Sequence, residues 1–164
     1  MADVRPVNQM LADTFEPKRQ NRWFFQFADD VIPQFVAKTF ARPTFTQESV
    51  VVDYINSKRY LAGKFEWGTM SMTLHDPIAP SSAQKVMEWA RLAHETISGR
   101  DGYAAFYKKD FSLNSMDPVG VTVEQWDIKG AFITDADFGG LDYASGEPTE
   151  ISLTVRMDEC ILRY

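Results

Sequence analysis

The side chains that could carry out catalysis or hold a metal are few and scattered in this sequence. The two histidines, His75 and His94, each precede one carboxylate, but neither has a second histidine or a cysteine at ligand spacing. A metal site needs three or four ligands that converge on one point. The acidic run Asp135-Ala136-Asp137 lacks the spacing of a calcium loop. We therefore predict no metal site and no bound cofactor.

Nucleophilic catalysis needs a nucleophile, a base and an orienting group in one place. The sequence contains no Gly-x-Ser-x-Gly turn. Gly139-Gly140 is not followed by the Lys-Ser or Lys-Thr pair of a phosphate-binding loop. We predict no catalytic residues and no enzymatic activity, which leaves a binding or structural role.

The single cysteine, Cys160, cannot form a disulfide within one chain, and this excludes a disulfide-dense secreted scaffold. Its place near the end of an alternating apolar segment predicts a small, half-buried strand residue. A cross-link to a neighbouring subunit is the alternative interpretation.

Length, charge and composition favour one compact domain. The chain has 164 residues, a formal net charge of -6 and a pI of about 4.9. Hydrophobic residues make up 45%, which excludes a disordered chain. The acidic balance argues against a generic duplex-DNA binder, which carries a basic excess. No apolar run approaches the ~20 residues that span a bilayer, and residues 1–6 lack the apolar stretch of a signal peptide. We expect a protein made in the cytoplasm.

Alternation of apolar and polar residues predicts a fold made mainly of antiparallel strands. The strand patterns cover residues 23–28, 34–40, 45–54, 58–63, 69–74, 103–107, 119–132 and 150–157. Asn56-Ser57 predicts a hairpin turn. The apolar positions change parity near Gln125, which predicts a bulge there. Residues 135–148 are rich in Gly, Asp and Ser and predict an acidic loop.

Residues 81–97 are the one segment that predicts a long helix. Ser81 and Gln84 form a capping-box pattern, apolar residues recur at helical spacing, and Gly99 follows at the position of a C-terminal cap. The fold class is therefore α+β, mainly antiparallel β: a small barrel or sandwich with the helix packed against the outer face of a sheet.

Two segments carry a family resemblance. The first is the run VDYINSKRYLAGKFEW (residues 52–67), which leads into MSMTL (70–74). The second comprises IKGAF (128–132), LDYAS (141–145) and EISLTV (150–155) with Asp158. In this order, and with the helix between them, the segments resemble the tail tube proteins of contractile-tailed (T4-like) bacteriophages from about residue 22 to the C-terminus.

The resemblance implies a structural virion protein of the phage tail, assembled in the host cytoplasm. Its hexameric rings stack into a tube inside a contractile sheath, and each subunit lends strands to one inner β-barrel. The barrel candidates are residues 45–63, 119–132 and 150–160, with the helix outside. Residues 1–20 would form an N-terminal arm and residues 21–164 the tail tube domain. The implied partners are further copies of the chain, sheath, baseplate and tape-measure proteins, and genomic DNA that passes through the lumen.

The resemblance also implies candidate site residues: polar strand faces would line the lumen, and the hairpin turn and the acidic loop would make contacts outside it. The candidates for the lumen are Gln47, Ser49, Asp53, Glu124 and Glu150. The candidates for contacts between rings, or with the sheath, are Asn56, Ser57, Lys58, Asp135 and Asp137. An acidic lumen would repel phosphates, so DNA would slide without sticking.

Three other functions remain open at this point. The chain could be the tube protein of a type VI secretion system or of a pyocin-like injection system, which shares the ring. A small-ligand-binding barrel would need a closed apolar cavity within one subunit. An enzyme would need His75 or His94 for turnover.

Overall fold

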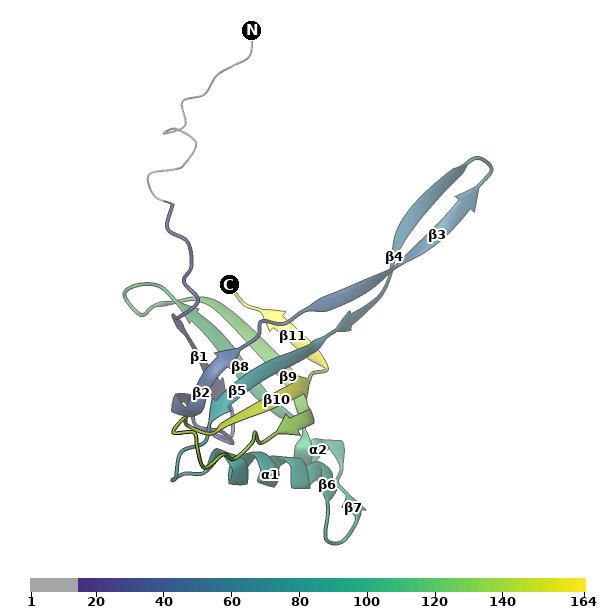
Figure 1. Ribbon diagram of the computed structural model, residues 1–164. Helices are drawn as coiled ribbons and strands as arrows, with labels where there is room; N and C mark the ends of the chain where they lie inside the picture. The colour runs from purple at the N-terminus through teal and green to yellow at the C-terminus, as the bar shows by residue number, and fades with distance from the viewer. Residues whose placement is uncertain (1–14) are drawn as a thin grey trace.

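Two antiparallel sheets pack face to face in the computed structural model, which describes residues 15–164. Six strands form one hydrogen-bonded path in the order β1-β8-β9-β10-β5-β2, and a seventh, β11, pairs with β9 off this path (Figure 1). Their bounds are β1 (Trp23–Phe27), β2 (Ala37–Phe40), β5 (Thr69–His75), β8 (Lys109–Met116), β9 (Thr122–Asp137), β10 (Glu150–Arg156) and β11 (Glu159–Leu162). The predicted α+β class, mainly antiparallel β, is confirmed. The barrel is not closed, because the path ends at β1 and β2.

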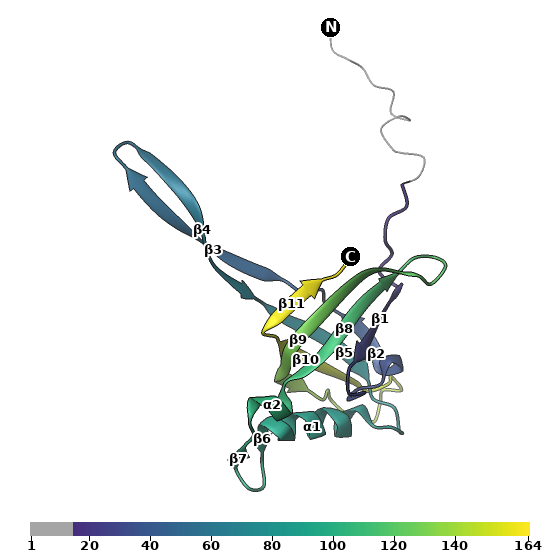
Figure 2. The same cartoon turned by 180° about the vertical axis from the view of Figure 1, so that it is seen from behind.

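The long strand β9 belongs to both sheets. Its first part pairs with β8 and β11, and its last part pairs with β10 (Figure 2). A register shift opposite Lys109 and Phe111 coincides with Gly130, whose φ is 64°. Such bulges bend a strand, so β9 turns from one sheet into the other at this point. A second shift places an extra residue between Thr122 and Glu124, close to the bulge predicted near Gln125.

The core lies between the sheets and follows the predicted alternation. Met70, Met72 and Leu74 of β5 are buried beside Ile151, Leu153 and Val155 of β10. Aromatic side chains of β1 and β8 fill the other half, with the rings of Phe27 and Phe111 5.0 Å apart. Each such side chain contributes about 1.5–3 kcal/mol when it is fully buried.

The main helix, α1 (Ser82–Ala93), begins where its cap predicts. The Ser81 hydroxyl accepts a hydrogen bond from the Gln84 amide at 3.4 Å. Val86 and Trp89 are buried, and the Trp89 indole donates to the Tyr107 carbonyl at 2.7 Å. The helix closes one end of the sandwich (Figure 1). The predicted position against the outer face of a sheet is therefore wrong.

Several predicted boundaries are also wrong. The helix ends at Ala93, and β6 (His94–Glu95) and β7 (Arg100–Asp101) form a short hairpin with Gly99 in its turn. Residues 103–107 contain the short helix α2 (Ala104–Tyr107) and not a strand, because the backbone turns there to meet Trp89. Residues 34–36 form a 3-10 turn, η2 (Gln34–Val36), before β2. Strand β8 was missed, since Phe111 and Leu113 are the only large apolar residues before its last position.

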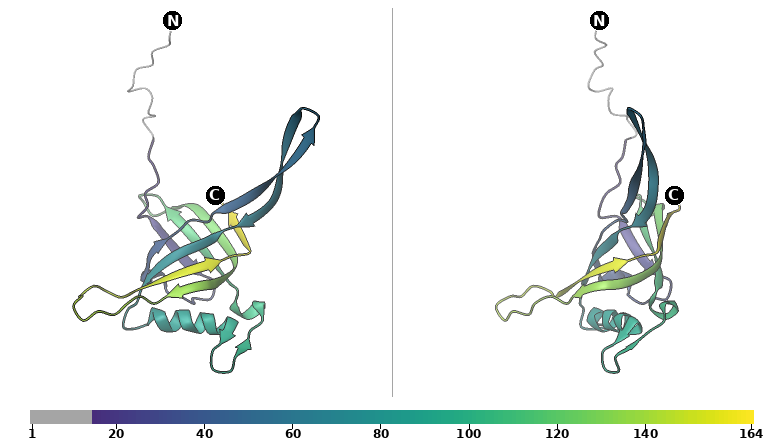
Figure 3. Two further views of the ribbon diagram at one scale, coloured as in Figure 1. Left: turned by 45° about the vertical axis from the view of Figure 1, so that its right-hand side comes forward. Right: turned by 90° about the vertical axis from the view of Figure 1, so that its right-hand side faces the viewer.

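A long hairpin, β3 (Phe45–Tyr54) and β4 (Ser57–Trp67), projects from the sandwich (Figures 1 and 3). The hairpin was predicted, but β4 is longer than residues 58–63. A bulge in β4 lies at Gly63, where an added Cβ would approach the Glu48 carbonyl oxygen to 3.0 Å. No helix within residues 15–164 has the length and apolar character needed to cross a membrane.

Gly130 provides a test of the bend in β9. Gly130→Ala should lower the free energy of unfolding by about 1–3 kcal/mol, because a side chain is strained at positive φ and the new Cβ would lie 2.3 Å from the Asp158 carboxylate. Gly146→Ala is the control, since no atom lies within 4 Å of its added Cβ. Urea unfolding measures both. Equal effects of the two substitutions would contradict the assignment.

Candidate assembly surface

One face of the projecting hairpin is aromatic. The ring centroids of Phe45 and Phe65 lie 4.9 Å apart, and those of Phe65 and Trp67 lie 5.1 Å apart. Residues that alternate along a strand share a face with their cross-strand partners, and Val51 pairs with Tyr60 further along. We call this the aromatic face of the hairpin. Because Trp67 packs against the core of the sandwich, the aromatic face continues the core side of the sheet.

The opposite face of the hairpin continues the outer side of the same sheet. Glu66, one residue before Trp67, forms an ion pair with Arg156 of β10. Arg156 lies on the outer side of the sheet, because its neighbour Val155 is buried. The hairpin, which is a two-stranded sheet of its own, thus packs against the sandwich near Trp67 and turns the same side toward solvent further out.

The outer half of the hairpin exposes apolar side chains on both faces. Tyr54 is 71% exposed and Ile55 is 87% exposed. Other exposed apolar residues of the hairpin are Phe45, Val50, Val51, Val52, Tyr60, Leu61 and Phe65. Exposed apolar residues gathered in this way are typical of an interaction surface.

The outer side of the sheet formed by β5, β10 and the end of β9 is polar. Its side chains alternate with the buried ones, and we call it the polar face. It carries Thr69, Ser71, Thr73, Ser152, Thr154, Arg156, Glu150, Asp135 and Asp137. Glu150 forms an ion pair with Lys38 and lies 3.9 Å from His75 Nδ1. Within residues 15–164, Asp135 and Asp137 form no ion pair, so this face carries unneutralised negative charge.

Glu124 lies elsewhere, in the interior, and is 7% exposed. Its carboxylate pairs with Lys18, accepts a hydrogen bond from the Trp126 indole at 2.6 Å and lies 3.8 Å from Arg42. Burial alone would raise the pKa of this carboxyl, but the hydrogen bonds from Lys18 and Trp126 and the charge of Arg42 outweigh it and lower the pKa. Glu124 therefore ties the first described residues and the segment before β3 to β9.

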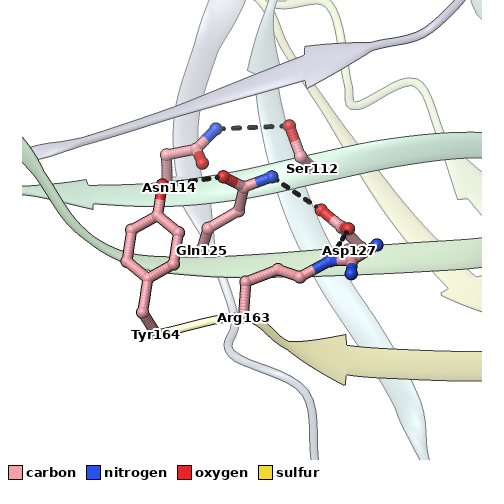
Figure 4. A network of polar contacts seen from close by, with 6 residues as sticks. All are labelled: Ser112, Asn114, Gln125, Asp127, Arg163 and Tyr164. Atoms are coloured by element: carbon pink, nitrogen blue, oxygen red, sulfur yellow. Dashed lines mark hydrogen bonds and ion pairs between the residues drawn. The ribbon is translucent and has the colours of Figure 1, made fainter.

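A network of hydrogen-bonded side chains lies on the outer side of the sheet that contains β8, β9 and β11 (Figure 4). Arg163 donates to Asp127 at 2.7 Å, and Gln125 donates to the same carboxylate at 2.8 Å. These bonds hold the pKa of Asp127 below its ordinary value, with that of Arg163 the largest cause. Tyr164 donates to Gln125 at 3.1 Å, so the end of the chain is fixed along β9.

The predicted lumen residues do not share one surface. Gln47, Ser49 and Asp53 lie on the aromatic face by alternation, Glu150 lies on the polar face, and Glu124 is buried. Of the predicted contact residues, Asn56, Ser57 and Lys58 lie at the tip of the hairpin, where Lys58 pairs with Asp53 at 3.6 Å.

Asp135 and Asp137, the other two contact candidates, belong to β9 and not to a loop as predicted, because they pair with Thr154 and Ser152. Sequence analysis missed the roles of Arg42, Arg156 and Glu66. The available signal was a charged residue at the end of each amphipathic segment. The sequence could not show which of these residues pair, because the partners lie up to 90 residues apart. The predicted arm, residues 1–20, lies largely outside the described residues.

Cys160 lies in β11 and is 7% exposed, as expected for a small strand residue. Burial, with a smaller contribution from the Asp127 carboxylate, raises the pKa of its thiol to about 11. At neutral pH the reactive thiolate is therefore scarce.

Comparisons with known proteins show which class of proteins shares this fold. No protein-family model and no curated protein matches the chain. Among solved structures, the fold is that of tube and tube-terminating proteins of contractile injection systems, as the sequence resemblance predicted.

Three solved structures illustrate the similarity. The cap of the anti-feeding prophage aligns with a TM-score of 0.76 at 13% identity, over 97% of this chain and 99% of that chain. The sheath-tube complex of the extracellular contractile injection system PVC aligns at 0.72 and 12% identity, over 98% and 99%. Hcp1 from Flavobacterium johnsoniae aligns at 0.54 and 12% identity, over 87% and 94%.

Glu124 yields a prediction about pH. At pH 7, Glu124→Gln should lower the free energy of unfolding by about 1.5–3 kcal/mol, the range for hydrogen bonds to charged groups. Because the folded-state pKa is lowered, the carboxylate stabilises the fold above its unfolded-state pKa of roughly 4.3, and this stabilisation is lost as the pH falls through the folded-state pKa. The difference between wild type and variant should therefore shrink in acid.

Urea unfolding between pH 7 and pH 3 measures this difference. Glu159→Gln, an exposed carboxylate at the start of β11, is the matched control and should change little at any pH. A difference between wild type and Glu124→Gln that stays constant across the range would contradict the ion-pair role.

Proposed function

We propose that this chain is a structural subunit of the inner tube of a contractile particle, and that it assembles into stacked hexameric rings. The observation that carries the proposal is the hairpin β3–β4, whose apolar side chains have no cover within the described chain. The similar solved structures are of tube and cap proteins, which supports a structural and non-enzymatic role. The hexamer itself rests on the sequence resemblance.

The hairpin gives a physical reason for assembly. Its aromatic face continues the core side of one sheet beyond the end of the sandwich, so the sandwich of a second copy would cover it in the way that the chain's own core covers β5. This contact joins two different surfaces, and such head-to-tail contacts form a closed ring or continue into a filament. Extending the sheet from copy to copy would also cover exposed strand edges.

The polar face is our proposal for the wall of the lumen. It is lined by hydroxyl side chains and by the carboxylates Asp135 and Asp137, and it includes Glu150 from the predicted set. In a ring, these carboxylates would repeat around the channel. Such a wall attracts no polyanion, since basic contacts to phosphate are what bind nucleic acid. DNA would therefore pass without specific binding.

A second candidate function has support of its own. The solved structures with TM-scores of 0.72 and 0.76 named above come from an extracellular injection system and from the anti-feeding prophage. A tube of such a system, or of a type VI or pyocin-like system, would use the same ring and the same hairpin contact. Capsid genes beside the gene for this chain would favour the phage tail, and secretion genes would favour the injection system.

The remaining partners follow from either assignment. The sheath would surround the tube, and the baseplate and tape-measure proteins would meet its ends and its interior. The similar structures include a sheath-tube complex and a baseplate assembly, which supports partners of these kinds. The particle, a phage tail or a related injection machine, is the proposed location.

Val51 tests the assembly role of the hairpin. Val51→Asp should abolish rings and tubes, because it places a charge on the aromatic face, while the thermal midpoint of the unassembled chain changes little since Val51 is 43% exposed there. Thr46→Asp is the control, because Thr46 lies on the other side of β3, away from the aromatic face. Sedimentation velocity and electron microscopy measure assembly. Normal tubes from Val51→Asp would argue against the hairpin contact.

Image reconstruction of assembled tubes tests the lumen assignment. Ser71, Thr73 and Ser152 should face the channel, with α1 on the outside, because the hydroxyl-bearing side of the sheet is the only side of β5 and β10 that is not packed in the core. A channel lined by α1, or by the network of Gln125 and Asp127, would refute this part of the proposal.

A further inference from the structure

A groove with basic walls lies between the two edge strands of the open barrel. It has a volume of about 610 Å³ and is bounded by β1, β2 and β8. Its floor includes Trp23, Phe40 and Leu113. The Trp23 and Phe40 rings, 6.0 Å apart, bridge the two edges, which no hydrogen-bonded ladder joins within residues 15–164. The groove thus combines an apolar floor with two strands that have no neighbour on this side.

The walls of the groove are positively charged. Lys18, Arg19, Lys38 and Arg42 line it. Lys18 and Arg42 share the carboxylate of Glu124, and Lys38 pairs with Glu150. Within residues 15–164, Arg19 forms no ion pair. Positive charge therefore exceeds negative charge around an apolar floor.

The connection between β9 and β10 has the opposite character. Residues 138–149 project from the body (Figure 3). Leu141 is 91% exposed and Tyr143 is fully exposed, and the carboxylates of Asp142 and Glu147 flank them. The Asp142 carboxylate accepts a hydrogen bond from the Ala144 amide at 2.9 Å, and the Asp142 carbonyl accepts one from the Ser145 amide at 3.3 Å, so local hydrogen bonds hold the turn.

We propose that the turn formed by residues 141–147 of one copy docks into this groove of a second copy. Tyr143 and Leu141 would fill the space above Trp23 and Phe40, and the carboxylates of Asp142 and Glu147 would meet the basic walls. No residue of the turn lines the groove of its own chain, so the contact is head-to-tail and propagates from copy to copy. The inference rests on the proposed assembly function and adds a second contact, separate from the hairpin, that helps to fix how copies are placed.

Ion pairs and the burial of an aromatic side chain would contribute differently to this contact. Exposed ion pairs contribute little each and are weakened by salt, so they would orient the turn. A buried aromatic side chain in a pocket contributes far more, so Tyr143 would anchor it. Salt should accordingly slow association, and truncation of Tyr143 should cost more than removal of any one charge.

The first test is cross-linking between copies of the full chain. Two single-cysteine proteins are made in a Cys160→Ala background, one with Ala144→Cys in the turn and one with Gln20→Cys in the groove, so that both anchors and all charges stay intact. The mixture should give a cross-linked dimer with a short bismaleimide when it assembles. Replacing Ala144→Cys with Ile97→Cys, on the exposed turn between β6 and β7, is the control and should give none.

The second test measures assembly by sedimentation. Tyr143→Ala should weaken it by about tenfold or more, as for a buried aromatic anchor, and Ile97→Ala should not. Glu147→Lys and Arg19→Glu should each weaken it by roughly two- to fivefold, and the double variant should recover most of the loss because the pair is restored with reversed sign.

The outcomes separate this inference from the proposed function. The wild-type chain is measured first. If it forms tubes, but the cysteine pair does not cross-link and Tyr143→Ala assembles normally, the docking contact is overturned and the tube function stands. If the wild-type chain stays monomeric at high concentration, both are overturned.

Discussion

The structure depends on the hairpin β3–β4, which extends beyond the core that the sandwich provides. Met70, Met72 and Leu74 find apolar partners inside the sandwich, whereas the aromatic face continues from Trp67 to Phe65 and Phe45 and then leaves the body. Burial of apolar surface is the dominant favourable term in folding and in association. The same alternation that builds the core therefore also leaves a face that one chain cannot bury.

Ion pairs connect the hairpin and the segment before it to the sandwich. Glu66 and Arg156 fix the base of the hairpin on the outer side of the sheet, and Glu124 holds Arg42, which lies between β2 and β3. The paired charges lie where strands change direction.

Sequence patterns predicted the elements whose own residues define their environment. The alternation of β5 and β10 and the Ser81 cap of α1 are local signals, and the structure confirms them. The errors fall where distant contacts decide. Residues 103–107 turn into a short helix beneath Trp89, and β8 exists because β1 and β9 flank it. Likewise, alternation placed Glu124 on a polar face, but a bulge beside it and the cations Lys18 and Arg42 place it inside.

The structure shows where the acidic side chains lie and which of them are paired with basic residues. Much of it is neutralised within the chain, as in the pairs of Glu124, Glu150 and Asp127 with basic residues. Within residues 15–164, the carboxylates without such pairs include Asp135 and Asp137 on the polar face and Glu147 beyond it, while positive charge gathers in the groove on another side of the sandwich. Copies with separated charges of this kind attract head-to-tail and repel like to like. The net charge of -6 is thus compatible with self-assembly, because the proposed docking contact joins regions of opposite sign.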